Sequence, residues 1–158
     1  MLELLFLLAF TLHNIEEGIW LPEWSKYAGK YHPKVLKHEF HFALIVFTSF
    51  GYLLTFVNLL YGQSTVAISY IYTGFLLMMC LNSIFPHLLA TIVIKKYAPG
   101  TVTGLVLNLP IGAVIISRYV ENGLMFHILI LVTIVISILT IASLQLLFKL
   151  GNRWIEPY

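Results

Sequence analysis

Long apolar stretches alternate with short polar connections along the whole chain. There are about five such stretches, and each comes near to or exceeds the roughly 20 residues that an α-helix needs to cross the hydrocarbon core of a bilayer. We predict membrane-spanning helices over residues 2–21, 39–61, 66–94, 101–117 and 123–148. The pattern therefore predicts an all-α fold, a polytopic membrane helix bundle, formed as a single domain over residues 1–158.

The composition supports this interpretation. Of the 158 residues, 59% are hydrophobic and only 10% are charged, whereas a soluble domain carries about 25% charged residues. The formal net charge of +2 comes from basic residues that lie next to the predicted spans, so it indicates no nucleic-acid partner. We expect a multi-pass protein of the cell membrane, whose surroundings and first partner are membrane lipid.

The distribution of basic residues predicts the orientation. With five crossings, the connections alternate between the two sides of the membrane. One side receives eight basic residues: Lys26, Lys30, Lys34, Lys37, Lys95, Lys96, Lys149 and Arg153. The other side receives Arg118 alone. The positive-inside rule then places the N-terminus outside and the C-terminus in the cytoplasm.

The first predicted helix contains the sequence HNIEE, from His13 to Glu17. Ionisable side chains inside a span are expensive and usually functional. At 100° per residue, Glu17 lies about 40° from His13, and Glu16 about 60° on the other side. A histidine and a glutamate spaced i, i+4 can hold one cation. The alternative is that both glutamates reach from a helix end to the lipid headgroups; the histidine one turn deeper on the same arc favours a functional cluster.

Polar residues of other predicted helices converge on the same depth. His13, His87 and Asn108 each lie about seven or eight residues from the cytoplasmic end of their spans, which is about 10–12 Å below that surface. His41 and His38 lie at the mouth of the second predicted helix, shallower but on the same side. Four helices thus contribute polar groups to one level of the bundle.

Asn82 lies four residues before a proline inside the third predicted helix. Pro86 leaves the carbonyl of Asn82 without its helical partner, and such backbone is tolerated in a membrane where it lines a polar cavity or is packed in protein. Asn82 is therefore either part of a cavity or a hydrogen-bonding contact between helices. The sequence leaves both alternatives open.

The HNIEE sequence resembles the motif of the small bacterial integral membrane proteins that are named for HXXEE. A second histidine and a YXPG motif of that family look like His87 and the YAPG sequence at Tyr97, Pro99 and Gly100. The motifs follow in the same order, and the resemblance covers most of residues 8–112. The resemblance implies a metal-dependent membrane enzyme. Pro99 and Gly100 can end a helix and reverse the chain, so we expect the YAPG sequence to form a structural turn.

The leading hypothesis is an intramembrane metalloenzyme. His13, His87 and Glu17 would hold a divalent ion, with His41 as a candidate fourth ligand, and zinc is favoured over iron. Either glutamate could be the ligand; the angular match to His13 favours Glu17, which leaves Glu16 as the general base. Hydrolysis of a lipid or a lipidated substrate is the expected reaction.

Two other functions remain open. A non-catalytic binding or regulatory protein could use the polar cluster only to fasten helices together. A carrier could pass protons or metal ions between protonatable side chains. Because the polar groups gather in the predicted cytoplasmic half, with no charged relay in the outer half, we rank the enzyme first and the carrier last.

Overall fold

The computed structural model describes residues 1–29 and 34–155; Lys30, which entered the charge count, lies outside them. The described part is all-α and contains no strand. Its elements are α1 (Leu2–Tyr27), α2 (Lys37–Tyr61), α3 (Val66–Asn82), η1 (Ser83–Leu88), α4 (Leu89–Ile94), α5 (Thr101–Thr103), η2 (Gly104–Asn108), α6 (Leu109–Glu121) and α7 (Phe126–Trp154). They form five stretches long and apolar enough to cross a membrane, which confirms the predicted helix bundle.

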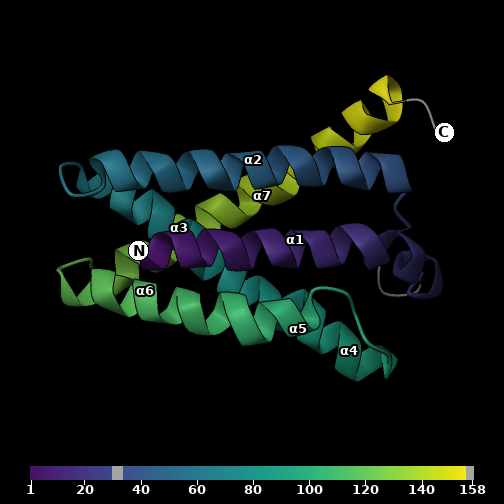
Figure 1. Ribbon diagram of the computed structural model, residues 1–158, viewed down its shortest axis with the longest axis horizontal. Coiled ribbons are helices and arrows are strands. Elements are labelled where there is room, and N and C mark those ends of the chain that lie inside the picture. Colours follow the sequence, from purple (N-terminus) through teal and green to yellow (C-terminus); the bar gives the residue numbers. More distant parts are fainter. Residues whose placement is uncertain (30–33, 156–158) are drawn as a thin grey trace.

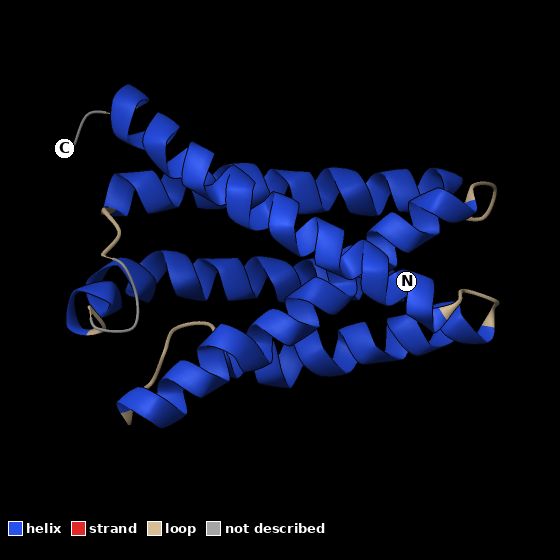
Figure 2. Cartoon of the chain, turned by 180° about the vertical axis from the view of Figure 1, so that it is seen from behind, coloured by secondary structure: helices blue, strands red, loops and turns tan. Residues whose placement is uncertain are grey.

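The five stretches run back and forth along the long axis of the molecule. The N-terminus and the turns at residues 62–65 and 122–125 lie at one end, which we call the N-terminal end (Figure 1). The turn at residues 95–100, the start of α2 and the end of α7 lie at the other, which we call the α4 end. Seen from behind, α7 crosses the bundle obliquely (Figure 2), and it packs against α2 and α3. This alternation is the one that the charge count required; which end faces the cytoplasm stays a prediction.

Aromatic side chains fill the centre of the bundle. Phe6, Phe10, Tyr72 and Phe75 are all buried, and the rings of Phe10 and Phe75 meet edge to face with 5.4 Å between centroids. Outward-facing aliphatic side chains such as Ile138 remain exposed. In a membrane these exposed side chains contact lipid tails, so association of the helices depends on close packing and interhelical hydrogen bonds.

Several helices extend beyond the apolar stretches from which we predicted them. The first predicted helix ends at residue 21, yet α1 continues through Pro22 to Tyr27. The fourth continues to Glu121 and the fifth to Trp154. Hydropathy marks where the chain leaves the hydrocarbon, whereas helical hydrogen bonding continues into the interfacial region, where water can also satisfy the backbone.

Prolines interrupt the third and fourth stretches near the α4 end. Phe85 has extended backbone angles (φ −127°, ψ 115°) directly before Pro86, as expected because a proline disfavours the helical region for the preceding residue. The π-helical segment η1 contains this break, and η2 ends shortly before Pro110. π-Helical turns of this kind often occur at functional sites. The breaks bring side chains of η1 and the following turn against α1.

Candidate metal centre

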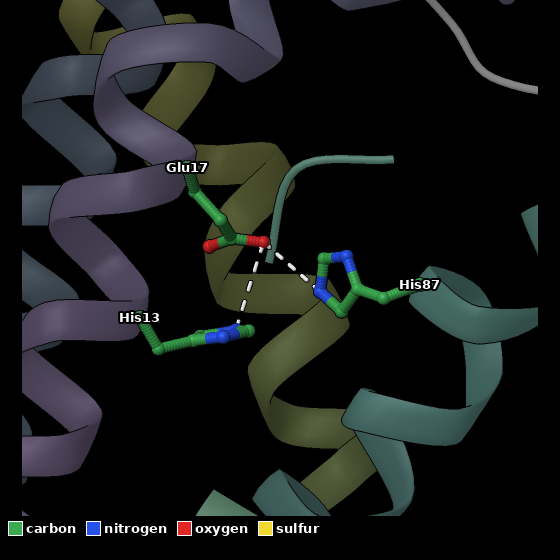
Figure 3. Close-up of side chains that lie close together, drawn as sticks. All are labelled: His13, Glu17 and His87. Atoms are coloured by element: carbon green, nitrogen blue, oxygen red, sulfur yellow. Dashed lines mark ion pairs between the residues drawn. The ribbon is translucent and has the colours of Figure 1, made fainter. Parts of the chain in front are cut away.

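Two histidines and a glutamate meet between α1 and η1. His13 and Glu17 project from α1, and His87 projects from η1 towards them (Figure 3). Glu17 Oε1 lies 3.0 Å from His87 Nε2 and 3.9 Å from His13 Nε2. One ligand atom from each residue lies within 4.8 Å of the others. We call these three residues the metal-centre cluster.

The local structure explains why these side chains meet. His13 and Glu17 are four residues apart on a continuous helix, so their side chains lie one above the other on one face. His87 directly follows Pro86, where the helical path is broken, and its ring lies nearly perpendicular to that of His13 with 5.1 Å between centroids. The side chains of His13 and His87 are 0% and 6% exposed, and that of Glu17 is 14% exposed. The three side chains are therefore largely shielded from solvent.

A hydrogen-bond chain determines the tautomer of His13. The hydroxyl of Thr103 donates to Glu16 Oε2 at 2.6 Å, and it lies 3.1 Å from His13 Nδ1. A hydroxyl has one proton to donate, so the Thr103 oxygen accepts from His13 Nδ1–H. The lone pair of His13 is then on Nε2, which is buried and has no hydrogen-bond partner. A buried acceptor without a hydrogen-bond partner is destabilising by about 1–3 kcal/mol, and the nearest carboxylate oxygen of the cluster, Glu17 Oε1, lies 3.9 Å away.

Asn82 and Glu17 both contact the second histidine. The amide nitrogen of Asn82 lies 3.0 Å from His87 Nε2, and Glu17 Oε1 lies 3.0 Å from the same nitrogen. The single in-plane position of Nε2 holds one hydrogen, which these two partners share. A cation bound to His87 and Glu17 would take the place of that hydrogen.

Glu16 faces a different set of partners from Glu17. Its carboxylate accepts hydrogen bonds from the hydroxyl of Tyr97, from the amide of Gly100 at 2.7 Å, and from the amide and hydroxyl of Thr103 at 3.3 and 2.6 Å. These donors lie in the YAPG turn and at the start of the fourth stretch, where the free amides of a helix N-terminus favour a negative charge. Glu16 therefore anchors this turn to α1.

Tyr97 remains protonated at neutral pH and can serve as a donor. Partial burial, reinforced by the carboxylate of Glu16, raises the pKa of Tyr97 to about 12. The phenol thus keeps its proton and donates to Glu16 under ordinary conditions. The aromatic ring itself is about half exposed and covers the turn from the outside.

The YAPG turn forms one wall of the metal-centre cluster. Gly100 has a φ of +89°, a conformation that is strained for any residue with a Cβ atom. A Cβ at this position would also lie 2.8 Å from Cε1 of His13 and 2.8 Å from Cε1 of His87. Pro99, like Gly100, is buried. Glycine is required here both for the turn and for the close approach of the two imidazoles.

His41, the candidate fourth ligand, does not join the cluster. Its Nε2 lies 2.7 Å from the carbonyl oxygen of Gly18. Pro22 lacks an N–H group, so it leaves the carbonyl of Gly18, four residues earlier, without a helical partner. His41 satisfies that carbonyl and thereby stabilises the continuation of α1 through Pro22.

His38 and Asn108 also lie outside the cluster. His38 Nε2 lies 3.3 Å from Asn152 Oδ1 on α7, so it joins the ends of two helices. Asn108 is fully buried at the end of η2, and neither polar atom of its side chain has a hydrogen-bond partner. Of the three residues predicted to support the site, only Asn82 contacts the cluster.

Sequence reasoning missed Thr103, which connects Glu16 to His13. A threonine in a transmembrane helix usually bonds to its own backbone, so its residue type gave no signal. Its spacing could have shown its role, because Thr103 follows Gly100 by three residues and thus shares a helix face with it.

Comparison with known proteins places the chain in a family. The family described as "Protein of unknown function with HXXEE motif" matches residues 4–115. The "Uncharacterized protein YrkK" of Bacillus subtilis (strain 168) is 48% identical over 149 residues, which cover 94% of both chains. No solved structure matches. The chain therefore belongs to the HXXEE-motif family, as its motifs predicted.

Proposed function

We propose that this member of the HXXEE-motif family is an intramembrane metal-dependent hydrolase that acts on a lipid or a lipidated substrate. The observation that carries the proposal is the metal-centre cluster: His13, Glu17 and His87 present one ligand atom each within 4.8 Å of the others. His13 Nε2 is buried there without a hydrogen-bond partner.

The donor set suits a catalytic zinc site better than the alternatives. Two imidazoles and one carboxylate are a known set of three protein ligands for catalytic zinc, which keeps its fourth position for water or substrate. Dinuclear iron sites in helical bundles use more carboxylates than this cluster offers. A zinc ion held by His13, Glu17 and His87 would supply a bound water with a pKa near 7.

The neighbouring residues have positioning roles in this proposal. Thr103 and Glu16 hold the Nδ1–H tautomer of His13, and Asn82 orients the ring of His87. Such partners of metal ligands determine ring orientation and ligand basicity. The four donors around Glu16 make this carboxylate a poor base, so we assign it to positioning. Oε1 of Glu17 faces the two imidazoles as the ligand atom, and we assign proton transfer to its second oxygen, Oε2.

Burial of the cluster supports the substrate class. The three side chains lie within stretches that are long and apolar enough to span a membrane, and Glu17 is the most exposed of them at 14%. A substrate with an apolar portion can enter such a site from the bilayer, whereas a fully hydrated molecule must lose its water to do so. A lipid, or a peptide carrying a lipid, meets this requirement.

Elemental analysis of the purified protein tests the metal centre. We expect one zinc ion per chain in the wild type and loss of the metal in H13A, E17Q and H87A. H41A is the matched control, because His41 bonds to the Gly18 carbonyl outside the cluster; it should retain the metal. Metal-free wild-type protein, purified without chelator and unable to take up added zinc, would refute the proposal.

The same preparations separate the enzyme from the alternatives. Hydrolysis of membrane lipids or lipidated peptides, lost in E17Q, supports the enzyme. Uptake of zinc or protons into proteoliposomes without hydrolysis indicates a carrier instead. Metal binding without either activity indicates a binding or regulatory protein.

A further inference from the structure

A groove runs between α1 and α2 on the face of α1 that lies opposite the metal-centre cluster. It has a volume of about 880 Å³, and its lining includes Asn14, Ile15, Ile19, Lys37, Ile45 and Tyr52. Figure 1 shows the two helices side by side along this length. At 100° per residue, Ile15 lies about 160° from His13 around the helix. The groove is therefore separate from the candidate site.

The uncharged polar side chains that line the groove have hydrogen-bond partners. Asn14 Nδ2 donates to Thr48 Oγ1 at 2.8 Å, and the hydroxyls of Thr11 and Tyr52 lie 3.1 Å apart. Nε2 of His41 bonds to the α1 backbone, as described above. These bonds fasten α1 to α2 and leave the remaining lining mainly aliphatic, so the length of the groove suits an apolar occupant.

The aliphatic lining is open to the surroundings. Ile15, Ile19 and Ile45 are 51%, 58% and 68% exposed. In a bilayer these side chains face hydrocarbon, and a hollow between two helices gives one acyl chain more contact than a flat helix surface does. The shape of the groove therefore favours an extended acyl chain.

The end of the groove is positively charged. Lys37, exposed in the first turn of α2, lines this end, and no Asp or Glu lines the groove anywhere. Within residues 1–29 and 34–155, Lys37 has no ion-pair partner. A lysine beside a membrane surface attracts anionic headgroups by about 1 kcal/mol. The charge complements an anion that is attached to an apolar chain.

The groove is long enough to hold an acyl chain of one leaflet. Lys37 and Tyr52 are separated by about 22 Å of helix at 1.5 Å per residue. This exceeds half of the roughly 30 Å hydrocarbon core, so the groove starts at one interface and reaches past the middle of the bilayer.

We propose that the α1–α2 groove binds one anionic phospholipid, with its headgroup at Lys37 and one acyl chain along Ile15, Ile19 and Ile45. The lipid would cover the exposed side of the contact between α1 and α2. Because the groove lies on the other face of α1, this binding does not depend on a metal at His13, Glu17 and His87.

Native mass spectrometry of the detergent-purified protein, titrated with phosphatidylglycerol or phosphatidylcholine, tests the proposal. The wild type should retain one phosphatidylglycerol and bind phosphatidylcholine more weakly. K37A should lose about fivefold of this preference, as the removal of about 1 kcal/mol requires. K34A is the matched control: it removes the same charge three residues earlier, outside the groove lining, and should keep the preference.

A second pair of variants tests where the acyl chain binds. I45W should fill the groove and weaken binding of both lipids, while I138W, at a similarly exposed position on α7, should not. Size-exclusion chromatography checks folding, and I15F replaces I45W if that variant aggregates. Equal binding of both lipids by the wild type, or equal losses in K34A and K37A, overturns the proposal. So does a dimer that I45W dissociates, which would show a second copy in the groove.

Discussion

Two groups of buried polar side chains lie near opposite ends of the same bundle, and they differ in chemistry. The metal-centre cluster towards the α4 end consists of ionisable residues, with one ligand atom of each within 4.8 Å of the others. Near the N-terminal end, Asn58 and Tyr119 form a neutral pair in which Asn58 Nδ2 donates to the Tyr119 hydroxyl at 2.7 Å. The Tyr119 ring lies 6.2 Å from that of Tyr72. We call these three residues the tyrosine cluster.

Under the proposed function, the difference separates a contact that holds helices together from one that binds a metal ion. A neutral donor–acceptor pair between helices is what a membrane bundle needs to hold its helices together, and the tyrosine cluster offers such a pair. The metal-centre cluster brings together a carboxylate and two imidazoles beside the break in the third stretch. Ionisable side chains inside a span are expensive and usually functional, whereas burial alone does not distinguish the two groups.

The largest expected effect is that of substituting Gly100, in the turn at the α4 end. G100A adds αL strain of about 1–2 kcal/mol and overpacking against the two imidazoles of about 1–3 kcal/mol, so we expect a loss of about 3 kcal/mol in the free energy of unfolding and loss of bound metal. Unfolding by sodium dodecyl sulfate and elemental analysis would measure both quantities.

G123A is the control for that prediction. Gly123 also has a positive φ, of +106°, but a Cβ there would meet nothing within 4 Å. Only the strain of about 1–2 kcal/mol should remain, with the metal retained. Equal effects of the two substitutions on both measurements would show that Gly100 is simply a turn residue.

The two adjacent glutamates should respond differently to the same change. E17Q removes a ligand oxygen of the cluster and should abolish stoichiometric metal binding, measured by zinc titration. E16Q keeps the ligands but weakens the bonds that hold Thr103 and the YAPG turn, so we expect a 10- to 100-fold loss of zinc affinity, the range found for partners of metal ligands. An E16Q variant that loses metal as completely as E17Q would mean that Glu16 is itself a ligand.

The tyrosine cluster should affect stability alone. Y119F removes the acceptor of the Asn58 amide, and interhelical hydrogen bonds in membranes contribute about 0.6 kcal/mol on average. We expect a loss of that order in the free energy of unfolding, with zinc affinity unchanged. A substantial change in zinc affinity would show that the tyrosine cluster and the metal-centre cluster are coupled, and the two would then not have separate roles.

The smallest expected effect concerns the pH dependence of stability. The pKa of Tyr97 is raised from 10.0 to about 12 in the folded state, so the folded protein holds this proton more tightly than the unfolded chain. Its stabilising contribution is present below pH 10 and is lost as the pH rises through 12. Y97F should lower stability by about 0.5 kcal/mol at pH 8 and should remove this alkaline loss in unfolding experiments between pH 9 and 12. An unchanged alkaline profile in Y97F would assign the loss to other groups.

The sequence predicted the elements well because apolar runs of membrane length have few alternatives. A span must satisfy its backbone internally, so hydropathy alone identifies the five stretches. Helix periodicity also placed His13 and Glu17 on one face, since that relation is internal to α1. Their residue types and i, i+4 spacing were sufficient for this part of the site.

Depth along a helix does not specify the direction in which a side chain faces. His41, His38 and Asn108 lie at plausible depths, yet His41 caps the carbonyl freed by Pro22 and His38 contacts Asn152. Rotation of each helix about its own axis is determined by packing against its neighbours, which no single stretch of sequence contains. Depth therefore predicted which level of the bundle is polar, but not which residues meet there.

The sequence by itself thus determined the class of protein, its five spans and the pairing of His13 with Glu17. Only the tertiary structure brought His87 to that pair. It also gave the two glutamates different partners, because Glu17 contacts the imidazoles and Glu16 bonds to the YAPG turn and Thr103. The physical reason is that helix periodicity is a local property, whereas contacts across helices depend on the break at Pro86 and on the fit of Gly100 against both histidine rings.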